Sequence, residues 1–332
     1  MQLTNSRTQL RSGGDKSRQT AGQGMFEMNQ TEVTEFKLMG LQDLPIIRPV
    51  LFLFIITIYI LTLCGNLLII VLVAVVPSLK SPMYFFLTQL SLSDILLTTT
   101  ITPNLLHDII HERSMITLKG CFTQFYFYTF SAGTECLLLS VMSYDRYLAI
   151  CKPLHYIPIM DLKLQLLLVL SCWVIVCFVE LLLVCLLCNL RFCGHVIDYY
   201  FCDLEPTIAL SCSDHKILDI SIFTIGPLIV LFPFFYILFS YISIFISISN
   251  ISSTDGKKKA FSTCSSHLIV VTMYYGTITI IYLVPSKGQS FNLKKVLSLL
   301  YTMGTPLFNP IIYSLRNEEI KNAVTVIYKT LK

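Results

Sequence analysis

The chain has 332 residues, of which 54% are hydrophobic and only 13% are charged, whereas soluble domains carry about 25% charged residues. This apolar excess excludes an ordinary water-soluble domain, and a net charge of +4 is too small to indicate a nucleic-acid-binding protein. The composition therefore predicts a membrane protein.

Seven apolar stretches are long enough to cross a bilayer, which requires about 20 residues of helix. They cover residues 50–76, 83–106, 121–150, 164–187, 218–248, 261–284 and 296–315. Their unbroken apolar character favours helices over the alternating strands of a β-barrel. The predicted fold is an all-α bundle of seven transmembrane helices.

The rest of the chain divides around this bundle. We expect an amino-terminal segment over residues 1–48, in which the polar residues 1–24 are disordered. The bundle then occupies residues 49–315, and a tail with a short amphipathic helix occupies residues 316–332. No apolar signal sequence precedes the first span, so we expect that span to act as an uncleaved anchor.

The charges beside the spans predict the orientation. With the amino-terminal end outside, cations outnumber acids in the inner loops and tail, whereas the outer loops are balanced. The sequon that begins at Asn29 would then be available for glycosylation, and the one at Asn250 would stay bare on the inner side. We therefore expect an extracellular amino terminus and a cytoplasmic carboxyl terminus.

Three acidic residues lie within apolar spans, where an ionised side chain is costly. Helical rise places Asp94 and Glu135 at similar depths on neighbouring helices. The pair could share a cation or a proton, or one member could be neutral and hydrogen-bonded between helices. For Glu180, the sequence offers no partner, and we expect a protonated interhelical hydrogen bond rather than a ligand contact.

Polar residues recur at helical spacing in two spans and predict faces turned toward the bundle interior. Such faces fit either a cavity with a few hydroxyl groups or interhelical hydrogen bonds without a cavity, and periodicity does not separate the two. The residues are Gln124, Tyr128, Ser131 and Glu135 in the third span, and Tyr275, Thr279 and Tyr282 in the sixth.

Several cysteines lie on the predicted outer side, where disulfides persist. Spacing does not declare which of them pair. They are Cys121, Cys188, Cys193, Cys202 and Cys212.

Five motifs occur in order at the predicted spans. They are Gly65-Asn66, SPMYFFLTQLSLSD (residues 81–94), MSYDRYLAICKPLHY (142–156), KAFSTCSSHL (259–268) and PLFNPIIYSLRN (306–317). A long loop, FCGHVIDYYFCDLEPTIALSCSD (192–214), separates the fourth and fifth spans. With these motifs, residues 28–332 resemble a rhodopsin-type G-protein-coupled receptor. More closely, they resemble an olfactory receptor of the class II (terrestrial) type, similar to its family 6.

The resemblance implies a plasma-membrane receptor, embedded in lipid, that binds a small, volatile, mostly neutral odorant in the outer half of the bundle. Amine receptors have an aspartate where this chain has Tyr128, which favours neutral ligands. The ligand contacts implied are Tyr128, Thr129, Ala132, Gly133, Ile225, Gly226, Tyr275, Ile278, Thr279, Tyr282 and Thr302.

The resemblance also implies activation of a heterotrimeric G protein of the olfactory stimulatory type, with cyclic AMP as the signal. The switch residues implied are Asp145, Arg146, Tyr147, Tyr241, Asn309, Pro310 and Tyr313. By similarity, Cys121 pairs with Cys202 and Cys193 with Cys212, while Asp94 and Glu135 form a sodium site. No other cofactor is expected, and accessory trafficking proteins are further expected partners.

Three other functions compete with this interpretation. A receptor for a non-odorant metabolite is the alternative within the same superfamily. A transporter or channel, suggested by Asp94 and Glu135, is less favoured because no inverted repeat is visible. An enzyme is not expected, because no nucleophile–base pair or metal-ligand cluster is present and His267 stands alone near the inner end of the sixth span.

Overall fold

The structure is a computed structural model that describes residues 33–40, 47–111, 114–283 and 289–330. Within these ranges the chain forms three short strands: β1 (Glu35–Leu38), β2 (Ser114–Thr117) and β3 (Val196–Ile197). The helices are α1 (Arg48–Val75), α2 (Pro82–Ile110), α3 (Leu118–Cys151), α4 (Pro153–Ile159), α5 (Leu162–Cys188), α6 (Leu204–Ile208), α7 (Lys216–Ser249), α8 (Thr254–Leu283), α9 (Gln289–Leu299), α10 (Thr305–Arg316) and α11 (Glu318–Thr330). A 3₁₀ turn, η1 (Pro77–Leu79), follows α1, and a π-helical turn, η2 (Leu300–Gly304), joins α9 to α10.

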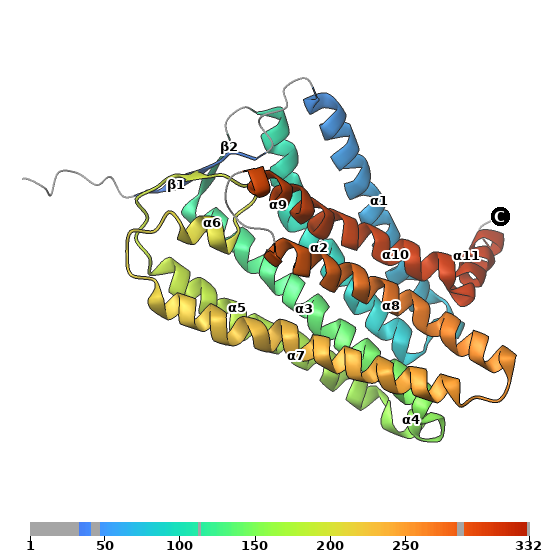
Figure 1. The fold of residues 1–332 in the computed structure, drawn as a ribbon. Coiled ribbons are helices and arrows are strands. Elements are labelled where there is room, and N and C mark those ends of the chain that lie inside the picture. Colours follow the sequence, from blue (N-terminus) through green and yellow to red (C-terminus); the bar gives the residue numbers. More distant parts are fainter. Residues whose placement is uncertain (1–32, 41–46, 112–113, 284–288, 331–332) are drawn as a thin grey trace, which may run out of the picture.

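Seven long segments form the bundle: α1, α2, α3, α5, α7, α8 and the continuous run α9–η2–α10 (Figure 1). Each coincides with a predicted span and begins before its predicted start, and all but α1 and α8 also end beyond the predicted limit. The last segment begins at residue 289 rather than 296. Polar residues at the ends explain the difference, because a helix continues beyond the apolar stretch for as long as its backbone can hydrogen-bond internally.

The outward faces of the bundle are apolar. Leu53 on α1, Phe178 on α5 and Phe223 on α7 are between 64% and 82% exposed. Among the described residues, four helical stretches are both long and apolar enough to cross a membrane: Arg48–Val75, Leu162–Cys188, Lys216–Ser249 and Cys264–Ile281. Continuous apolar surface of this kind is stable against lipid and not against water.

A small sheet and helix α6 lie at one end of the bundle, hereafter the sheet end (Figure 1). Its strand order is β2-β1-β3, with β1 antiparallel to β2 and parallel to β3. No pattern in the sequence predicts this sheet. Its strands have four residues or fewer and come from distant parts of the chain, so no alternating pattern marks them.

The opposite end, hereafter the tail end, holds α4 and α11 (Figure 1). Helix α11 matches the predicted amphipathic helix of the tail. Two groups of buried apolar side chains divide the core between the two ends. One includes Leu79, Met142 and Ile244, and the other includes Phe36, Phe125 and Tyr200.

Local residue choices set where several helices begin. The Thr117 hydroxyl accepts a hydrogen bond from the Gly120 N–H at the start of α3, and the Asp161 carboxylate accepts one from the Leu164 N–H at the start of α5. Both satisfy backbone donors that have no partner within the helix. Prolines occupy the first turns of α2 and α10, where a missing N–H costs little.

Candidate functional site

A cavity of about 540 Å³ lies toward the sheet end, between α3, α5, α7, α8 and α9, with α6 above it. Its walls are largely apolar, with Phe125, Val179, Leu183, Ile222 and Ile229 among them. The volume and the lining are typical of small-molecule pockets. A cavity is therefore present, but among the described residues of the two predicted polar faces only Tyr128 lines it. Gln124, Glu135 and Tyr275 instead form hydrogen bonds to neighbouring elements.

Most of the expected ligand contacts meet at this cavity, and they come from three helices. They belong to α3, α7 and α8. The lining includes Tyr128, Thr129, Ala132, Gly133, Ile225, Gly226 and Ile278.

Gly133 permits close packing beside the cavity. A Cβ atom at this position would lie 2.8 Å from Cγ1 of Val176 on α5. That separation is shorter than carbon atoms tolerate, so any larger residue would push α3 and α5 apart. The glycine therefore permits the close approach of α3 to α5 beside the cavity.

Of the described residues expected from the sixth span, Ile278 lines the cavity, whereas Tyr275 and Thr279 do not. Tyr274, Ile278 and Ile281 line the cavity, whereas Tyr275 lies beside it and its hydroxyl contacts the Cys136 thiol at 3.0 Å. Thr279 is exposed and does not line the cavity. Adjacent residues on a helix point about 100° apart, so packing of Tyr275 against Cys136 turns the expected stripe away. The side chain of Tyr282 lies outside the described residues.

Thr302 on the seventh segment was also misplaced by the sequence prediction. Its hydroxyl bonds to the Tyr200 hydroxyl at 3.1 Å and to the Ser298 carbonyl at 2.9 Å, and Tyr301 lines the cavity instead. Both residues lie in the π-helical turn η2, where the wider turn changes the direction of successive side chains. A regular helical pattern could not anticipate this.

Glu180 on α5 differs from expectation in one respect. An interhelical contact is present, because the Thr129 side chain on α3 is a hydrogen-bond neighbour of the carboxyl group. However, the group also lines the cavity, and its Oε2 atom has no hydrogen-bond partner among the described residues. Glu180 therefore lines the cavity, whereas the sequence favoured a protonated interhelical hydrogen bond.

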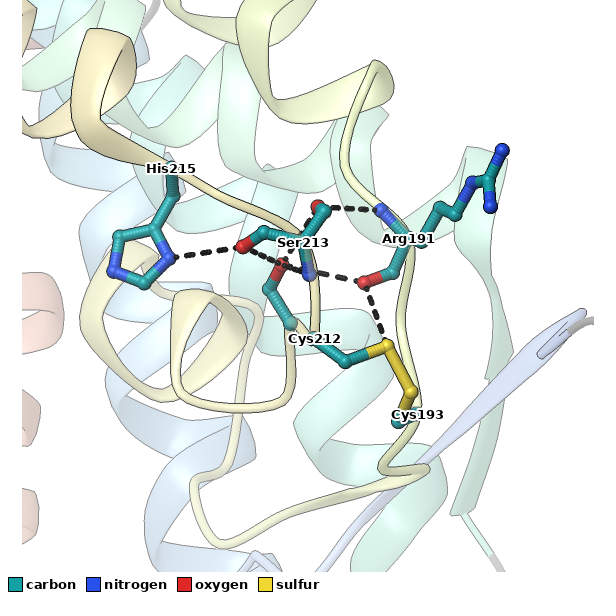
Figure 2. Close-up of a disulfide and its surroundings, with 6 residues drawn as sticks. Arg191, Cys193, Cys212, Ser213 and His215 are labelled. Carbon is teal, nitrogen blue, oxygen red and sulfur yellow. Dashed lines mark hydrogen bonds between the residues drawn. A yellow bond between two sulfur atoms is a disulfide. The ribbon is translucent and has the colours of Figure 1, made fainter. Parts of the chain in front are cut away.

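The segment between α5 and α7, residues 189–215 and hereafter the lid loop, covers the cavity. The structure contains both expected disulfides: Cys121–Cys202 joins this loop to α3, and Cys193–Cys212 closes the loop on itself. Figure 2 shows the second bridge and the neighbouring contact in which Ser213 Oγ accepts a hydrogen bond from the Arg191 N–H at 3.0 Å.

Ion pairs and tyrosines also fasten the lid loop, and they were not predicted from the sequence. Lys294 on α9 pairs with Glu205, and the neighbouring Lys295 pairs with Asp198. On the same side, the Tyr199 hydroxyl bonds to that of Ser298. These partners are about 90 to 100 residues apart in the chain, so no local pattern could pair them.

Asp203 begins helix α6 within this loop. Its carboxylate accepts a hydrogen bond from the Leu204 N–H at 2.8 Å. Burial raises the pKa of Asp203, although this hydrogen bond and the nearby Lys294 act in the opposite direction. The pKa values of Tyr199 and Tyr200 are raised by burial as well, so both remain neutral donors at physiological pH.

At the tail end, Asp145 and Arg146 form a buried ion pair. Arg146 Nε donates to Asp145 Oδ2 at 2.9 Å, and the Tyr156 hydroxyl donates to Oδ1 at 2.8 Å. Burial and the adjacent carboxylate raise the pKa of Tyr156, so it remains a donor. Tyr147, the third residue of this motif, is half-buried, with the Lys152 ammonium 6.0 Å from its ring centre.

A second contact at the tail end centres on His267, which is not alone as the sequence suggested. Its Nδ1 lies 2.7 Å from the Tyr241 hydroxyl on α7, and its Nε2 lies 3.1 Å from the Leu139 carbonyl on α3. One α8 side chain thus joins three helices. The hydroxyl of Tyr313, by contrast, is buried without a hydrogen-bond partner among the described residues.

Asp94 and Glu135 are brought together by Asn309 on α10. The Asn309 amide nitrogen lies 3.1 and 3.0 Å from the two carboxyl oxygens of Asp94, and 3.3 Å from Oε1 of Glu135. Pro310 follows directly and packs close to α1, where a Cβ on Gly65 would lie 3.0 Å from its ring. The expected glycosylation site, Asn29, lies outside the described residues.

Comparison with known proteins agrees with this architecture. The sequence model of the olfactory receptor family matches residues 55–330. The chain is 44% identical to human olfactory receptor 10A7 over 307 residues, which is 92% of this chain and 97% of that receptor. It is 43% identical to mouse olfactory receptor 1M1 over 91% of this chain and 97% of that receptor.

A match of this length and identity covers the bundle, the lid loop and the tail helix together. It also settles the class of activity, because the family consists of G-protein-coupled receptors and not of enzymes. The chain belongs to the olfactory receptor family: it is a seven-transmembrane, rhodopsin-like receptor of the plasma membrane that binds odorants and couples to a G protein.

Proposed function

We propose that this receptor binds small volatile odorants in the cavity beneath the lid loop and activates a G protein of the olfactory stimulatory type, which raises cyclic AMP. The observation that supports this most directly is the cavity itself. It has apolar walls, lies among the expected α3, α7 and α8 residues and is covered by a fastened loop. Neutral hydroxyl groups, such as that of Tyr128, allow weak and permissive recognition.

The sheet end faces the cell exterior in this proposal. Both disulfides lie at that end, and disulfides persist in oxidising compartments. The Asp145–Arg146 pair then lies on the cytoplasmic side, together with the tail helix α11. Epitope tags read on intact cells test this orientation, and two ends labelled on the same side would contradict it.

Activation follows from a difference in contacts between two arrangements of the bundle. A ligand shifts the population only by binding one arrangement better than the other. In the arrangement described here, Arg146 is held by Asp145, and Tyr241 is held by His267. Release of both would free Arg146 for the G protein and allow Tyr241 to approach Tyr313, whose hydroxyl has no described partner.

We further propose that Asp94 and Glu135 hold a sodium ion when the receptor is at rest. Two carboxyl groups meet at one amide, which donates hydrogen bonds but brings no positive charge. Oxygen ligands suit a hard cation, and a monovalent ion would offset one of the two negative charges. A shared proton would offset the same charge, so ligand-free signalling measured in sodium and in choline medium separates the two.

Arg146→Ala tests the coupling role. In cells that express the chain, we expect odorant-dependent cyclic AMP to be abolished at equal surface level. Lys152→Ala is a matched control, because Lys152 lies at the same end but outside the buried pair. An undiminished response in Arg146→Ala would overturn this assignment. A stronger response through an inhibitory than through a stimulatory G protein would overturn the choice of G protein.

A further inference from the structure

We propose that Glu180 is the counter-ion for an ammonium group, so that the cavity selects small aliphatic amines over neutral molecules of the same shape. This inference rests on the proposed function, because it names the chemical class of ligand for the same cavity. It departs from the expectation of neutral ligands that followed from Tyr128.

The geometry of Glu180 points to a missing partner. The residue is only 7% exposed and lines the cavity. Its Oε2 atom accepts no hydrogen bond from the described residues, and the polar neighbours of the group are the Thr129 side chain and the phenol of Tyr126. A buried polar atom without a partner is costly, and a ligand that supplies a donor removes that cost.

The charges around the cavity also favour a cation. The acidic side chains in the lining outnumber the basic ones: Glu180, Asp203, Glu205 and Asp219 against Lys294. Lys294 is already paired with Glu205, and Asp219 faces the His215 ring at 3.4 Å near the surface. A cavity with this balance attracts cations and repels carboxylates.

The shape of the site fits an amine with a hydrocarbon body. Val179 and Leu183, on the same helix as Glu180, are apolar lining residues, and Ile222 and Ile229 extend this surface on α7. An alkyl group would bury against these side chains while the ammonium group meets the carboxylate. The expectation of neutral ligands considered only the position of Tyr128 on α3. The acidic side chain that lines the cavity, Glu180, comes from α5 instead.

The experiment compares amines with alcohols of the same size: hexylamine with 1-hexanol, and cyclohexylamine with cyclohexanol. In wild-type receptor, we expect each amine to raise cyclic AMP at a concentration about tenfold or more below that of its alcohol, as loss of one charged hydrogen bond implies. Glu180→Gln should lose this preference and leave the alcohol response within about threefold.

Asp214→Asn is the matched control, because it removes an equal charge at the same end. Asp214 is exposed, pairs with Lys216 and does not line the cavity. This variant should keep the amine preference. If wild-type receptor responds equally to amines and alcohols, or if Glu180→Gln keeps the preference, the proposal is wrong.

A binding measurement without a G protein separates this inference from the proposed function. Hexylamine should raise the thermal unfolding temperature of purified wild-type receptor but not that of Glu180→Gln. The effect of 1-hexanol on the unfolding temperature should be the same in the two proteins. Amine binding without any cyclic AMP response would support the role of Glu180 and reject the coupling assignment. A cyclic AMP response to alcohols with no amine effect in either assay would reject the role of Glu180 alone.

Discussion

The two ends of the bundle are held together in different ways. At the sheet end, two disulfides and the Lys294–Glu205 and Lys295–Asp198 ion pairs fasten the lid loop. At the tail end, the described polar contacts between helices are hydrogen bonds such as that of Tyr241 with His267. Covalent closure keeps a binding cavity in shape, whereas hydrogen bonds can exchange when helices move. The comparison indicates a rigid end for the ligand and a reversible end for the G protein.

The largest expected effect comes from breaking the covalent closure. Cys121→Ser opens a loop of 81 residues, and Cys193→Ser opens one of 19. Loop-closure entropy predicts that the free energy of unfolding falls by about 4.5 kcal/mol in Cys121→Ser and by about 3 kcal/mol in Cys193→Ser. Surface expression and the thermal unfolding temperature should therefore fall further in Cys121→Ser. Equal losses in the two variants would show that loop length does not control stability here.

At the other end, His267→Phe removes two hydrogen bonds, to Tyr241 and to the Leu139 carbonyl. Each contributes about 1 kcal/mol, so the resting arrangement should be destabilised by about 2 kcal/mol relative to the active one. Ligand-free cyclic AMP per surface receptor should rise by up to about 30-fold. Thr272→Val, on the exposed side of the same helix, is the control. If ligand-free cyclic AMP does not rise in His267→Phe, this histidine does not stabilise the resting arrangement.

A smaller effect is expected from Tyr156→Phe. The variant loses one hydrogen bond to Asp145, and the tyrosine is only half-buried. We expect a loss of about 1 kcal/mol, which corresponds to about a fivefold rise in ligand-free activity. The same cyclic AMP assay measures it. A rise equal to that of His267→Phe would show that the two tail-end contacts open together.

The smallest effect concerns pH and the sheet end. Burial raises the folded-state pKa of Asp203 above its unfolded value, so its ionisation destabilises the fold as pH rises through the folded pKa. Asp203→Asn can still cap α6 and removes this ionisation. The variant should be more stable than wild type at pH 7, by less than about 1 kcal/mol, and the difference should vanish toward pH 4. Thermal unfolding at both values checks the sign, and a difference that grows with acid would contradict it.

Much of the fold was predictable from the sequence because membrane spans obey a simple requirement. Every backbone polar group in lipid must bond within its own helix, so an apolar stretch of sufficient length becomes a helix wherever it occurs. The proximity of Asp94 to Glu135 was also predictable, because the rise per residue of a helix fixes the depth of each residue along its span. The tail helix α11 followed from its amphipathic pattern.

Rotation about each helix axis was not predictable. Depth depends on residue number alone, but the direction of a side chain depends on which neighbours it packs against. Tyr275 turns toward Cys136, and Thr302 sits in a π-helical turn, so their neighbours Tyr274 and Tyr301 line the cavity. The lid loop, likewise, is fastened by residues about 90 to 100 positions apart.

By itself, the sequence therefore determined that the chain forms a helical membrane bundle, where its spans lie and which residues share a depth. Only the tertiary structure decided which side chains face the cavity, and it placed Glu180 among them. The physical reason is that lipid imposes helix formation locally, through hydrogen bonds four residues apart. Helix rotation and loop closure result instead from contacts between distant parts of the chain.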